Sequence, residues 1–297
     1  MSDCIIKGMA LGNEVRFFAA YTTDIAEKAR QIHNTSPICT AALGRLLTAG
    51  AMMGSMSKND SDIITLRITG NGPAKGLTVT SDSHANVKGI VYEPIVDLPP
   101  NLEGHLNVGD AIGDGILYVI KDIGLKDPYV GQVPLVTSEI AEDLTYYFAT
   151  SEQIPTSVGL GVLMNHDNTV DKAGGFIIQL MPYASEETIK KIEDGLAGFK
   201  SVTSFLSSAF HDRSKSEDEI LTDMMRSILG DDVHVEDKMP TEYKCNCSRE
   251  RVTKALISVG RKEIENMIND GEPINMHCEF CNTDYKFSIE ELKELLA

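Results

Sequence analysis

The sequence Cys245-Asn246-Cys247 is followed, after thirty intervening residues, by Cys278-Glu279-Phe280-Cys281. These two closely spaced pairs hold four of the six cysteines in the chain. Two thiol pairs separated by a helix-length insert resemble a four-cysteine zinc site, in which each pair supplies two of the tetrahedral ligands. The second pair has the usual CxxC spacing. The CxC spacing of the first pair is rarer in zinc ribbons and is therefore more diagnostic.

Four thiolates would fill the coordination sphere of a zinc ion and leave no position for a substrate or an activated water. The pattern therefore argues against a catalytic zinc hydrolase. Spacing alone leaves two alternatives open, a purely structural zinc ribbon and a redox-active site. Lys244, Arg249, Arg251 and His277 flank the cysteines and favour thiolates, the oxidisable form. Each pair is also close enough in sequence to close into a local disulfide, with a small, strained ring at the CxC pair.

The residues around the cysteines predict a small module. Ser248 is placed to cap a first helix, and a second helix extends to Gly271. A β-type stretch containing the CxxC pair continues to Phe287, and Ser288 forms a capping box with Glu291 for a last helix. A module of this size has a small core, so zinc binding, worth on the order of 10 kcal/mol, would supply much of its stability. Oxidation of the ligands would then unfold the module locally.

The composition indicates a globular protein with more than one domain. The chain has 297 residues, of which 42% are hydrophobic. Its formal net charge of -17 disfavours partners that require a basic surface, so we expect neither nucleic-acid nor membrane binding. We expect no signal peptide, because the first residues include Asp3 and Glu14, and no apolar run is long enough to span a bilayer. In an unexported protein, this cysteine pattern favours metal binding or redox chemistry over structural disulfides.

Residues 1–182 predict a strand-rich α+β domain with antiparallel sheets and packed helices. An opening hairpin turns near Gly12, and two helices follow, the second beginning at Pro37. Residues 62–135 contain short β-type runs separated by turn residues, which predict an antiparallel meander. The strands expected after the opening hairpin are residues 63–69, 76–81, 87–92, 116–123, 157–164 and 175–181.

The second half of the chain changes character twice. Thr137 or Ser138 is expected to cap a helix that precedes the last two strands. Residues 183–242 predict a helical, acidic linker with an apolar stripe. This stripe either docks permanently on the first domain or docks under one condition and is released under another. Residues 243–297 then form the small C-terminal zinc-binding α/β module.

Three other features receive a structural interpretation. The segment from Gly70 to Gly76 is glycine-rich, but it joins two predicted strands, whereas a dinucleotide site needs a strand followed by a helix. His166 and Asp167 lie in a polar turn without an organised nucleophile, so we interpret them as part of a solvated turn. Cys4 and Cys39 have no base or metal ligand nearby in sequence and are expected to be small buried residues.

The segment Glu242-Tyr243-Lys244-Cys245-Asn246-Cys247-Ser248, with Cys278-Glu279-Phe280-Cys281, resembles the CxC and CxxC signature of the 33 kDa chaperonin family. Members of this family are redox-regulated heat-shock holdases of the bacterial cytoplasm. The resemblance extends over the full length, because a strand-rich domain, a helical linker and a cysteine module follow in the family's order. Gly70-Asn71-Gly72-Pro73 is also similar to a family segment.

This resemblance implies one zinc ion per chain, bound by Cys245, Cys247, Cys278 and Cys281 in a reduced, inactive state. It implies the disulfides Cys245–Cys247 and Cys278–Cys281 after oxidation, with zinc release and unfolding of the linker. The oxidised protein would form a homodimer and capture unfolding client proteins without ATP. The resemblance thus implies a cytoplasmic stress-response chaperone and not an enzyme.

Two other functions compete with this one. The first is a constitutive zinc-ribbon module that binds nucleic acid or a protein, and the acidic charge counts against its nucleic-acid version. The second is a thiol-disulfide oxidoreductase that uses Cys278 and Cys281. Such enzymes place CxxC at the start of a helix, whereas this pair lies in a β-type segment and is matched by a second thiol pair.

Overall fold

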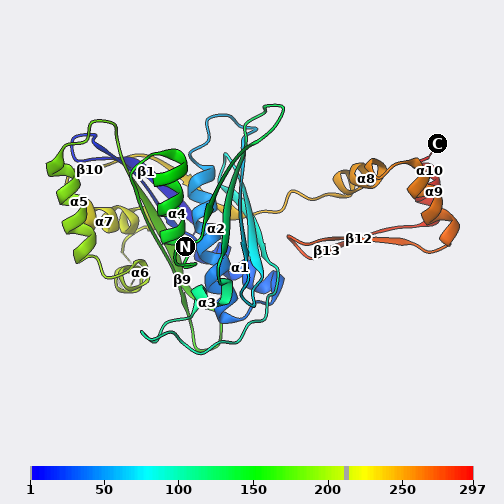
Figure 1. Ribbon diagram of the computed structural model, residues 1–297, viewed down its shortest axis with the longest axis horizontal. Coiled ribbons are helices and arrows are strands. Elements are labelled where there is room, and N and C mark those ends of the chain that lie inside the picture. Colours follow the sequence, from blue (N-terminus) through cyan, green and yellow to red (C-terminus); the bar gives the residue numbers. More distant parts are fainter. Residues whose placement is uncertain (1, 211–213, 297) are drawn as a thin grey trace. The chain divides into compact units, whose positions relative to one another are not determined.

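The computed structural model of the protein describes residues 2–210 and 214–296. The chain forms two compact units, Met1–Lys244 and Cys245–Ala297. Antiparallel sheets and packed helices make up the first unit, so the predicted α+β class is confirmed (Figure 1). None of the helices in the described ranges combines the length and apolar character needed to cross a lipid bilayer.

The first sheet has the strand order β10-β1-β2-β9-β8, and all of its neighbouring strands are antiparallel. The predicted opening hairpin is present as β1 and β2. Strand β9 begins five residues earlier than predicted, because the polar start of its sequence still pairs with β8. The strands of this sheet are β1 Cys4–Ala10, β2 Val15–Tyr21, β8 Thr156–Met164, β9 Val170–Leu180 and β10 Val233–Pro240.

The second sheet has the order β11-β5-β4-β3-β6-β7, which corrects the predicted meander. Strand β6 pairs with β3 and not with β5, which precedes it in the chain, because the connection through helix α3 crosses the sheet. Strand β7 was not predicted, since its short sequence contains a glycine and ends in a proline. The elements are β3 Ile63–Gly70, β4 Gly76–Asp82, β5 Asn86–Val91, α3 Val108–Ile112, β6 Gly115–Asp122, β7 Tyr129–Pro134 and β11 Glu242–Tyr243.

Helix α2, Pro37–Gly54, lies between the two sheets (Figure 1). Nearly all of its residues are buried, as expected for a helix that is apolar on every side. Helix α1, Thr23–His33, packs beside α2 and contributes one apolar face to the same core. This core therefore joins the inner faces of both sheets.

Helix α4, Ala141–Tyr147, begins later than predicted and continues as a π-helical turn, Phe148–Glu152. Neither Thr137 nor Ser138 caps it. The fully buried carboxylate of Asp143 does so instead, by accepting N–H groups of Val136, Thr137, Ser138 and Ile140 at 2.7–3.2 Å. An acidic side chain inside the first turn thus replaces the hydroxyl cap that the sequence suggested.

The described residues of the linker, 183–210 and 214–242, form helices followed by extended strands, so the prediction of a helical linker is wrong for its last part. Val233–Pro240 form β10, because the edge of β1 accepts a further strand despite the charges of this segment. The helices are α5 Glu186–Gly198, α6 Val202–Ala209 and α7 Glu217–Leu229. The apolar stripe of α7 is buried on the outer face of the first sheet, in a second core.

The second unit follows the predicted order of helices with a strand hairpin inserted. Ser248 caps α8 by accepting the N–H of Arg251, and Ser288 forms the predicted capping box with Glu291. Its core is small, with four buried apolar residues at its centre, Leu256, Ile264, Phe287 and Leu292. The elements are α8 Arg249–Ser258, α9 Arg261–Asp270, β12 Ile274–Cys278, β13 Thr283–Phe287 and α10 Ile289–Glu294.

Asp3 links the start of the chain to α1 and gives a testable pH dependence. Its carboxylate accepts the N–H of Ile25 at 2.6 Å, and burial raises its pKa from 3.8 to about 7. The stability that Asp3 contributes is therefore full below pH 3.8 and is lost as the pH rises toward 7. Between pH 5.5 and 7, the first unit should lose about 2 kcal/mol relative to an Asp3→Asn variant. Urea unfolding of both proteins across this range measures the difference, and parallel profiles would contradict the prediction.

Candidate metal centre

Two turns of the second unit present the four cysteines. Cys245 and Cys247 lie in the extended segment that precedes α8, and the backbone changes direction there before Ser248 begins the helix. Cys278 ends β12, and Cys281 lies in the turn before β13. The carbonyl of Cys278 accepts the N–H groups of Cys281 at 3.2 Å and of Asn282 at 2.8 Å, which fixes this turn. The CxxC pair thus joins two strands and does not open a helix, unlike the pair of a thioredoxin-like enzyme.

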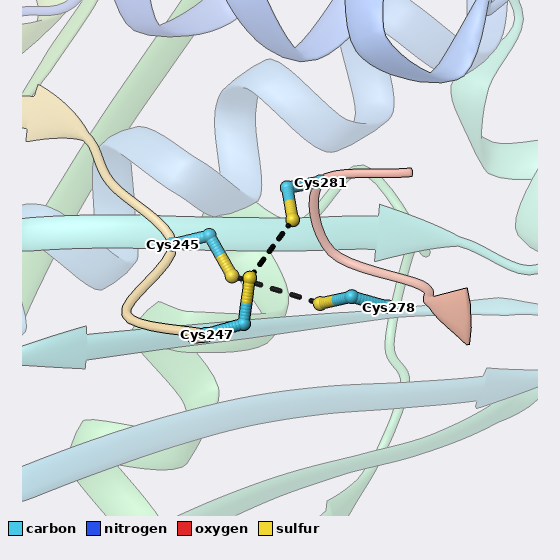
Figure 2. A group of neighbouring side chains, drawn as sticks. All are labelled: Cys245, Cys247, Cys278 and Cys281. Atoms are coloured by element: carbon cyan, nitrogen blue, oxygen red, sulfur yellow. Dashed lines mark hydrogen bonds between the residues drawn. The ribbon is translucent and has the colours of Figure 1, made fainter. Parts of the chain in front are cut away.

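The structure brings all four predicted site cysteines together, with their sulfur atoms within 4.8 Å of one another (Figure 2). The Sγ atoms of Cys245 and Cys278 are 3.7 Å apart, and those of Cys247 and Cys281 are 3.2 Å apart. A tetrahedral site with zinc–sulfur bonds of about 2.3 Å has sulfur–sulfur edges of about 3.8 Å. The four free thiols therefore fit a closed four-sulfur metal site.

Two polar side chains next to the sulfurs were not identified from the sequence. Tyr285 donates its hydroxyl to Sγ of Cys247 at 3.2 Å, and Oγ1 of Thr283 lies 3.2 Å from Sγ of Cys281. Both residues lie on β13, and their spacing of two places them on one face of the strand. The alternation of polar residues directly after the CxxC pair was the signal that could have revealed them. They orient the sulfurs in the manner of partners around a metal site.

The thiols have different proton affinities. Burial raises the pKa of Cys245 to about 12 and also raises the pKa of Cys278. Burial acts in the same direction on Cys281, but contacts with Thr283 and with the sulfurs of Cys247 and Cys278 outweigh it and lower the pKa to about 7. The thiol of Cys281 thus ionises more readily than those of Cys245 and Cys278. A bound cation removes this difference, because it compensates the charge of all four thiolates.

Each of the four basic residues that flank the cysteines has an acceptor beside it, and three of these acceptors are carboxylates. Nζ of Lys244 is 3.1 Å from Glu242, Arg249 is 2.5 Å from Glu291, and Nδ1 of His277 is 2.8 Å from Asp284. The fourth, Arg251, donates to the carbonyl of Asn246 at 3.3 Å. The predicted effect of these side chains on the thiolates stays a prediction.

The glycine-rich segment Gly70–Gly76 is a turn between β3 and β4, as predicted. The N–H groups of Gly72 and Ala74 donate to the carbonyls of Ile112 and Ala111, each at 2.8 Å. These donors bind protein carbonyls, so they do not form the phosphate cradle of a nucleotide site.

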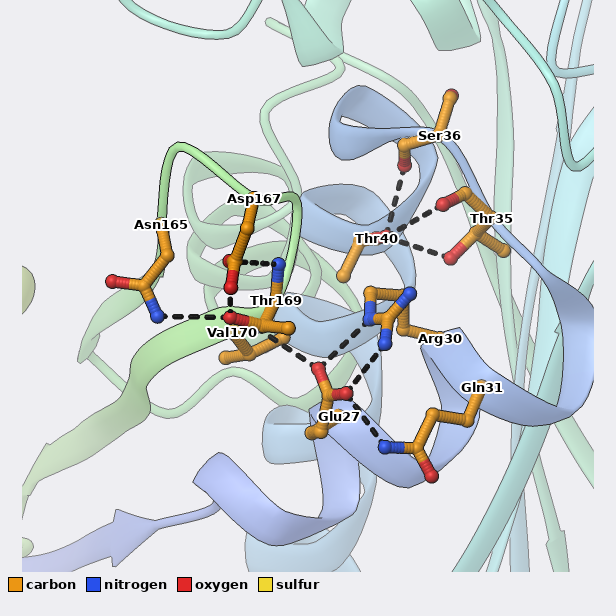
Figure 3. A network of polar contacts seen from close by, with 10 residues as sticks. All are labelled: Glu27, Arg30, Gln31, Thr35, Ser36, Thr40, Asn165, Asp167, Thr169 and Val170. Atoms are coloured by element: carbon orange, nitrogen blue, oxygen red, sulfur yellow. Dashed lines mark hydrogen bonds and ion pairs between the residues drawn. The ribbon is translucent and has the colours of Figure 1, made fainter.

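The other polar features also match their structural interpretation. Asp167 accepts the N–H of Thr169 at 3.1 Å within the β8–β9 turn (Figure 3). The N–H of Val170 donates to Glu27 on α1 at 3.0 Å, which holds this turn against the helix. Cys4 and Cys39 are buried with exposed fractions of 2% and 0%.

The chain reaches Cys245 from a docked segment, residues 241–244, which we call the strap. Tyr243 is 3% exposed and belongs to the main core of the first unit, and its hydroxyl donates to the carbonyl of Gly89 at 3.0 Å. Lys28 donates to the carbonyl of Tyr243 at 3.0 Å, and the N–H of Lys244 donates to Val87 at 2.9 Å. An aromatic anchor thus lies two residues before the cysteine cluster.

Comparisons with known proteins match nearly the whole chain to one group of related proteins. The model of a family described as Hsp33 protein matches residues 3–288. A 33 kDa chaperonin of Lachnoclostridium phytofermentans is 55% identical over 100% of this chain and 99% of its own length. The 33 kDa chaperonin of Agathobacter rectalis is 52% identical over 99% of this chain and 100% of its own. The crystal structure of the 33 kDa chaperonin of Thermotoga maritima, at 38% identity, has a TM-score of 0.88 and covers 100% of this chain and 98% of its own.

Proposed function

The chain belongs to the Hsp33 family, and we propose that it is a redox-regulated, ATP-independent holdase chaperone of the cytoplasm. In the resting state the four cysteines are reduced, hold one zinc ion, and the chain does not bind clients. Oxidation converts it into a dimer that captures unfolding proteins and prevents their aggregation. The single observation that carries this proposal is the convergence of four sulfurs within 4.8 Å in a unit that has little other core.

Cys245, Cys247, Cys278 and Cys281 are the residues that would hold zinc. When bound, zinc supplies a cross-link between the segment before α8 and the β12–β13 turn, and it supplies no reactive position. Only four apolar side chains are buried at the centre of this unit. The cysteines therefore contribute a large part of its folding free energy through metal binding.

Oxidation removes these ligands. Two thiols and one molecule of peroxide give one disulfide and two molecules of water, so two molecules of peroxide convert the four cysteines into two disulfides. We propose the pairs Cys245–Cys247 and Cys278–Cys281. All four sulfurs are within reach of one another in the cluster. Once zinc has left, however, the two segments separate, and only partners close in sequence stay near each other.

Unfolding of residues 243–297 then acts on residues 183–242. The chain continues without interruption from α7 through β10 and the strap to Cys245. Helices α5, α6 and α7 cover apolar residues on the outer face of the first sheet. Release of this linker would expose that face of the core formed by residues 1–182. The proposal thus gives the three parts of the chain the roles of client-binding core, redox-sensitive linker and switch.

One experiment tests the proposal on a single sample. The zinc-loaded, reduced chain is treated with peroxide under mild heat, and zinc release, disulfide pairing and aggregation of chemically unfolded citrate synthase are followed without nucleotide. We expect zinc to leave, peptide mapping to show the two proposed disulfides, and aggregation to fall at least tenfold. Reduction in the presence of zinc should reverse all three changes.

The readouts separate the parts of the proposal. If zinc leaves and aggregation is unchanged, the chain is not a redox-activated holdase. If aggregation is suppressed equally before oxidation, the module is a constitutive binder. If the mapped disulfides join the CxC pair to the CxxC pair, the proposed pairing is wrong while the chaperone activity stands.

A further inference from the structure

One continuous segment closes an edge of each large sheet. Strand β10 is the outermost strand of the first sheet, beside β1, and the next residues form β11, the outermost strand of the second sheet, beside β5. Residues 233–244 therefore cover two sheet edges in the described part of the first unit (Figure 1). The same segment leads directly into Cys245.

Strand β10 has few side-chain contacts that hold it in place. Its sequence, VHVEDKMP, contains three consecutive charged residues, and only Val233 is fully buried. The ladder with β1 is irregular between Lys7 and Gly8, where β10 carries an extra residue. Lys7 pairs with Asp237 at 2.9 Å and Lys238 with Asp218 at 2.5 Å, but all four side chains are at least one third exposed. Such ion pairs contribute little, so the backbone ladder supplies most of the attachment.

The neighbouring strand β1 is, by contrast, apolar on one face and carries a single charged residue, Lys7, on the other. Cys4, Ile6 and Ala10 belong to the core beneath α7, and Ile5 belongs to the core around α2. An apolar strand with an open edge readily pairs with another extended chain, which is why folded proteins keep such edges covered. Strand β10 provides this cover with a polar sequence that adds little apolar contact of its own.

We propose that β1, once residues 233–244 are released, binds an extended segment of an unfolding protein as a new antiparallel strand in the place of β10. This inference rests on the proposed chaperone function and specifies how a client is held. The length of the occupant follows from the seven residues of β1 that now pair with β10, Cys4–Ala10. Its preferred chemistry is mostly uncharged and rich in β-branched and aromatic residues without internal proline, because Lys7 is the one charged residue of β1.

Hydrogen exchange resolved to single residues tests this mode of binding on the full chain. In an antiparallel ladder, one set of β1 amides points toward β10 and the alternate set points toward β2. In the reduced chain both sets should be protected. After oxidation, the set facing β10 should exchange at least tenfold faster, and reduced, carboxymethylated α-lactalbumin should restore its protection by at least tenfold. The set facing β2 should remain protected throughout and serves as the internal control.

Calcium-loaded, folded α-lactalbumin is the matched control and should not restore the protection of the β10-facing amides. Suppression of aggregation without renewed protection of β1 overturns the inference and leaves the proposed function intact. Continued protection of the β10-facing set in the oxidised, client-free chain overturns it as well, because β10 has then not left. Absence of aggregation suppression after oxidation refutes the proposed function, and the inference falls with it.

Discussion

Removal of the metal from the reduced, zinc-loaded chain is expected to unfold residues 245–297 and to leave the core of residues 1–182 folded. Metal binding to a site of four thiolates is worth on the order of 10 kcal/mol. A single small core in a unit of this size supplies only about 3–5 kcal/mol. The centre of this unit has four buried apolar side chains, so loss of the metal exceeds what the core provides. The main core around α2 lies almost wholly within residues 1–182 and should not change.

Limited trypsin digestion with mass spectrometry, before and after a zinc chelator, measures this effect. Cleavage at the basic residues of α8 and α9 should accelerate at least a hundredfold, while sites within β3 and β6 of the first unit remain protected. A Cys278→Ser variant should be cleaved rapidly even without chelator. A Cys39→Ala variant is the matched control, because Cys39 lies in the main core, and its digestion should still depend on the chelator. Slow cleavage of α8 and α9 in the zinc-free chain would show that the apolar core suffices.

The candidate site could be predicted from the sequence because its chemistry is local. Two residues of the same type at CxC or CxxC spacing necessarily lie close together, so the only long-range assumption was that both pairs meet. The helix caps Ser248 and Ser288 were also predictable, since a capping hydroxyl acts on N–H groups within three residues. The structure confirms that the sulfurs meet and that these caps are formed.

Features that depend on partners distant in sequence were not predictable. Nothing in the sequence VHVEDKMP indicates a strand. Strand β10 forms only through backbone pairing with β1, more than 220 residues earlier in the chain. The pairing of β6 with β3 is likewise set by the crossing connection and not by either strand's sequence. Tyr243 gave no signal of its own, since a single aromatic residue before a cysteine pair fits equally well in solvent or in a core. Its burial is decided by α1 and β5.

Replacement of this anchor, Tyr243→Ala, is expected to release the strap in the reduced chain. The substitution removes a side chain that is 3% exposed together with its bond to Gly89, and such losses cost about 3–5 kcal/mol. That cost corresponds to a shift of about 150- to 5,000-fold in the docking equilibrium of the strap. Because the strap continues directly from β10, the β1 edge and the apolar face beneath α7 should become available without oxidation. Zinc should stay bound, since Tyr243 is not among the four thiol ligands.

Hydrogen exchange at Thr241 and Lys244 measures strap release, because their N–H groups donate to Asp3 and Val87. Zinc content and client aggregation are measured on the same reduced sample. Tyr243→Phe should weaken the docking free energy of the strap by only about 1 kcal/mol. This variant keeps the aromatic ring and loses the hydroxyl contact. Tyr92→Ala is the matched control, because Tyr92 directly follows β5, is 40% exposed, and its replacement should leave exchange and aggregation unchanged.

The Tyr243→Ala result decides which element restrains the chaperone. If the reduced, zinc-bound variant suppresses aggregation, the strap is the restraint and the metal acts by keeping the chain beside it folded. If the strap is released and aggregation continues, docking of α7 on the first sheet suffices to block clients, and oxidation must act beyond the strap. Protection that persists at Thr241 and Lys244 would instead show that the backbone bonds of β11 hold the strap without its aromatic anchor.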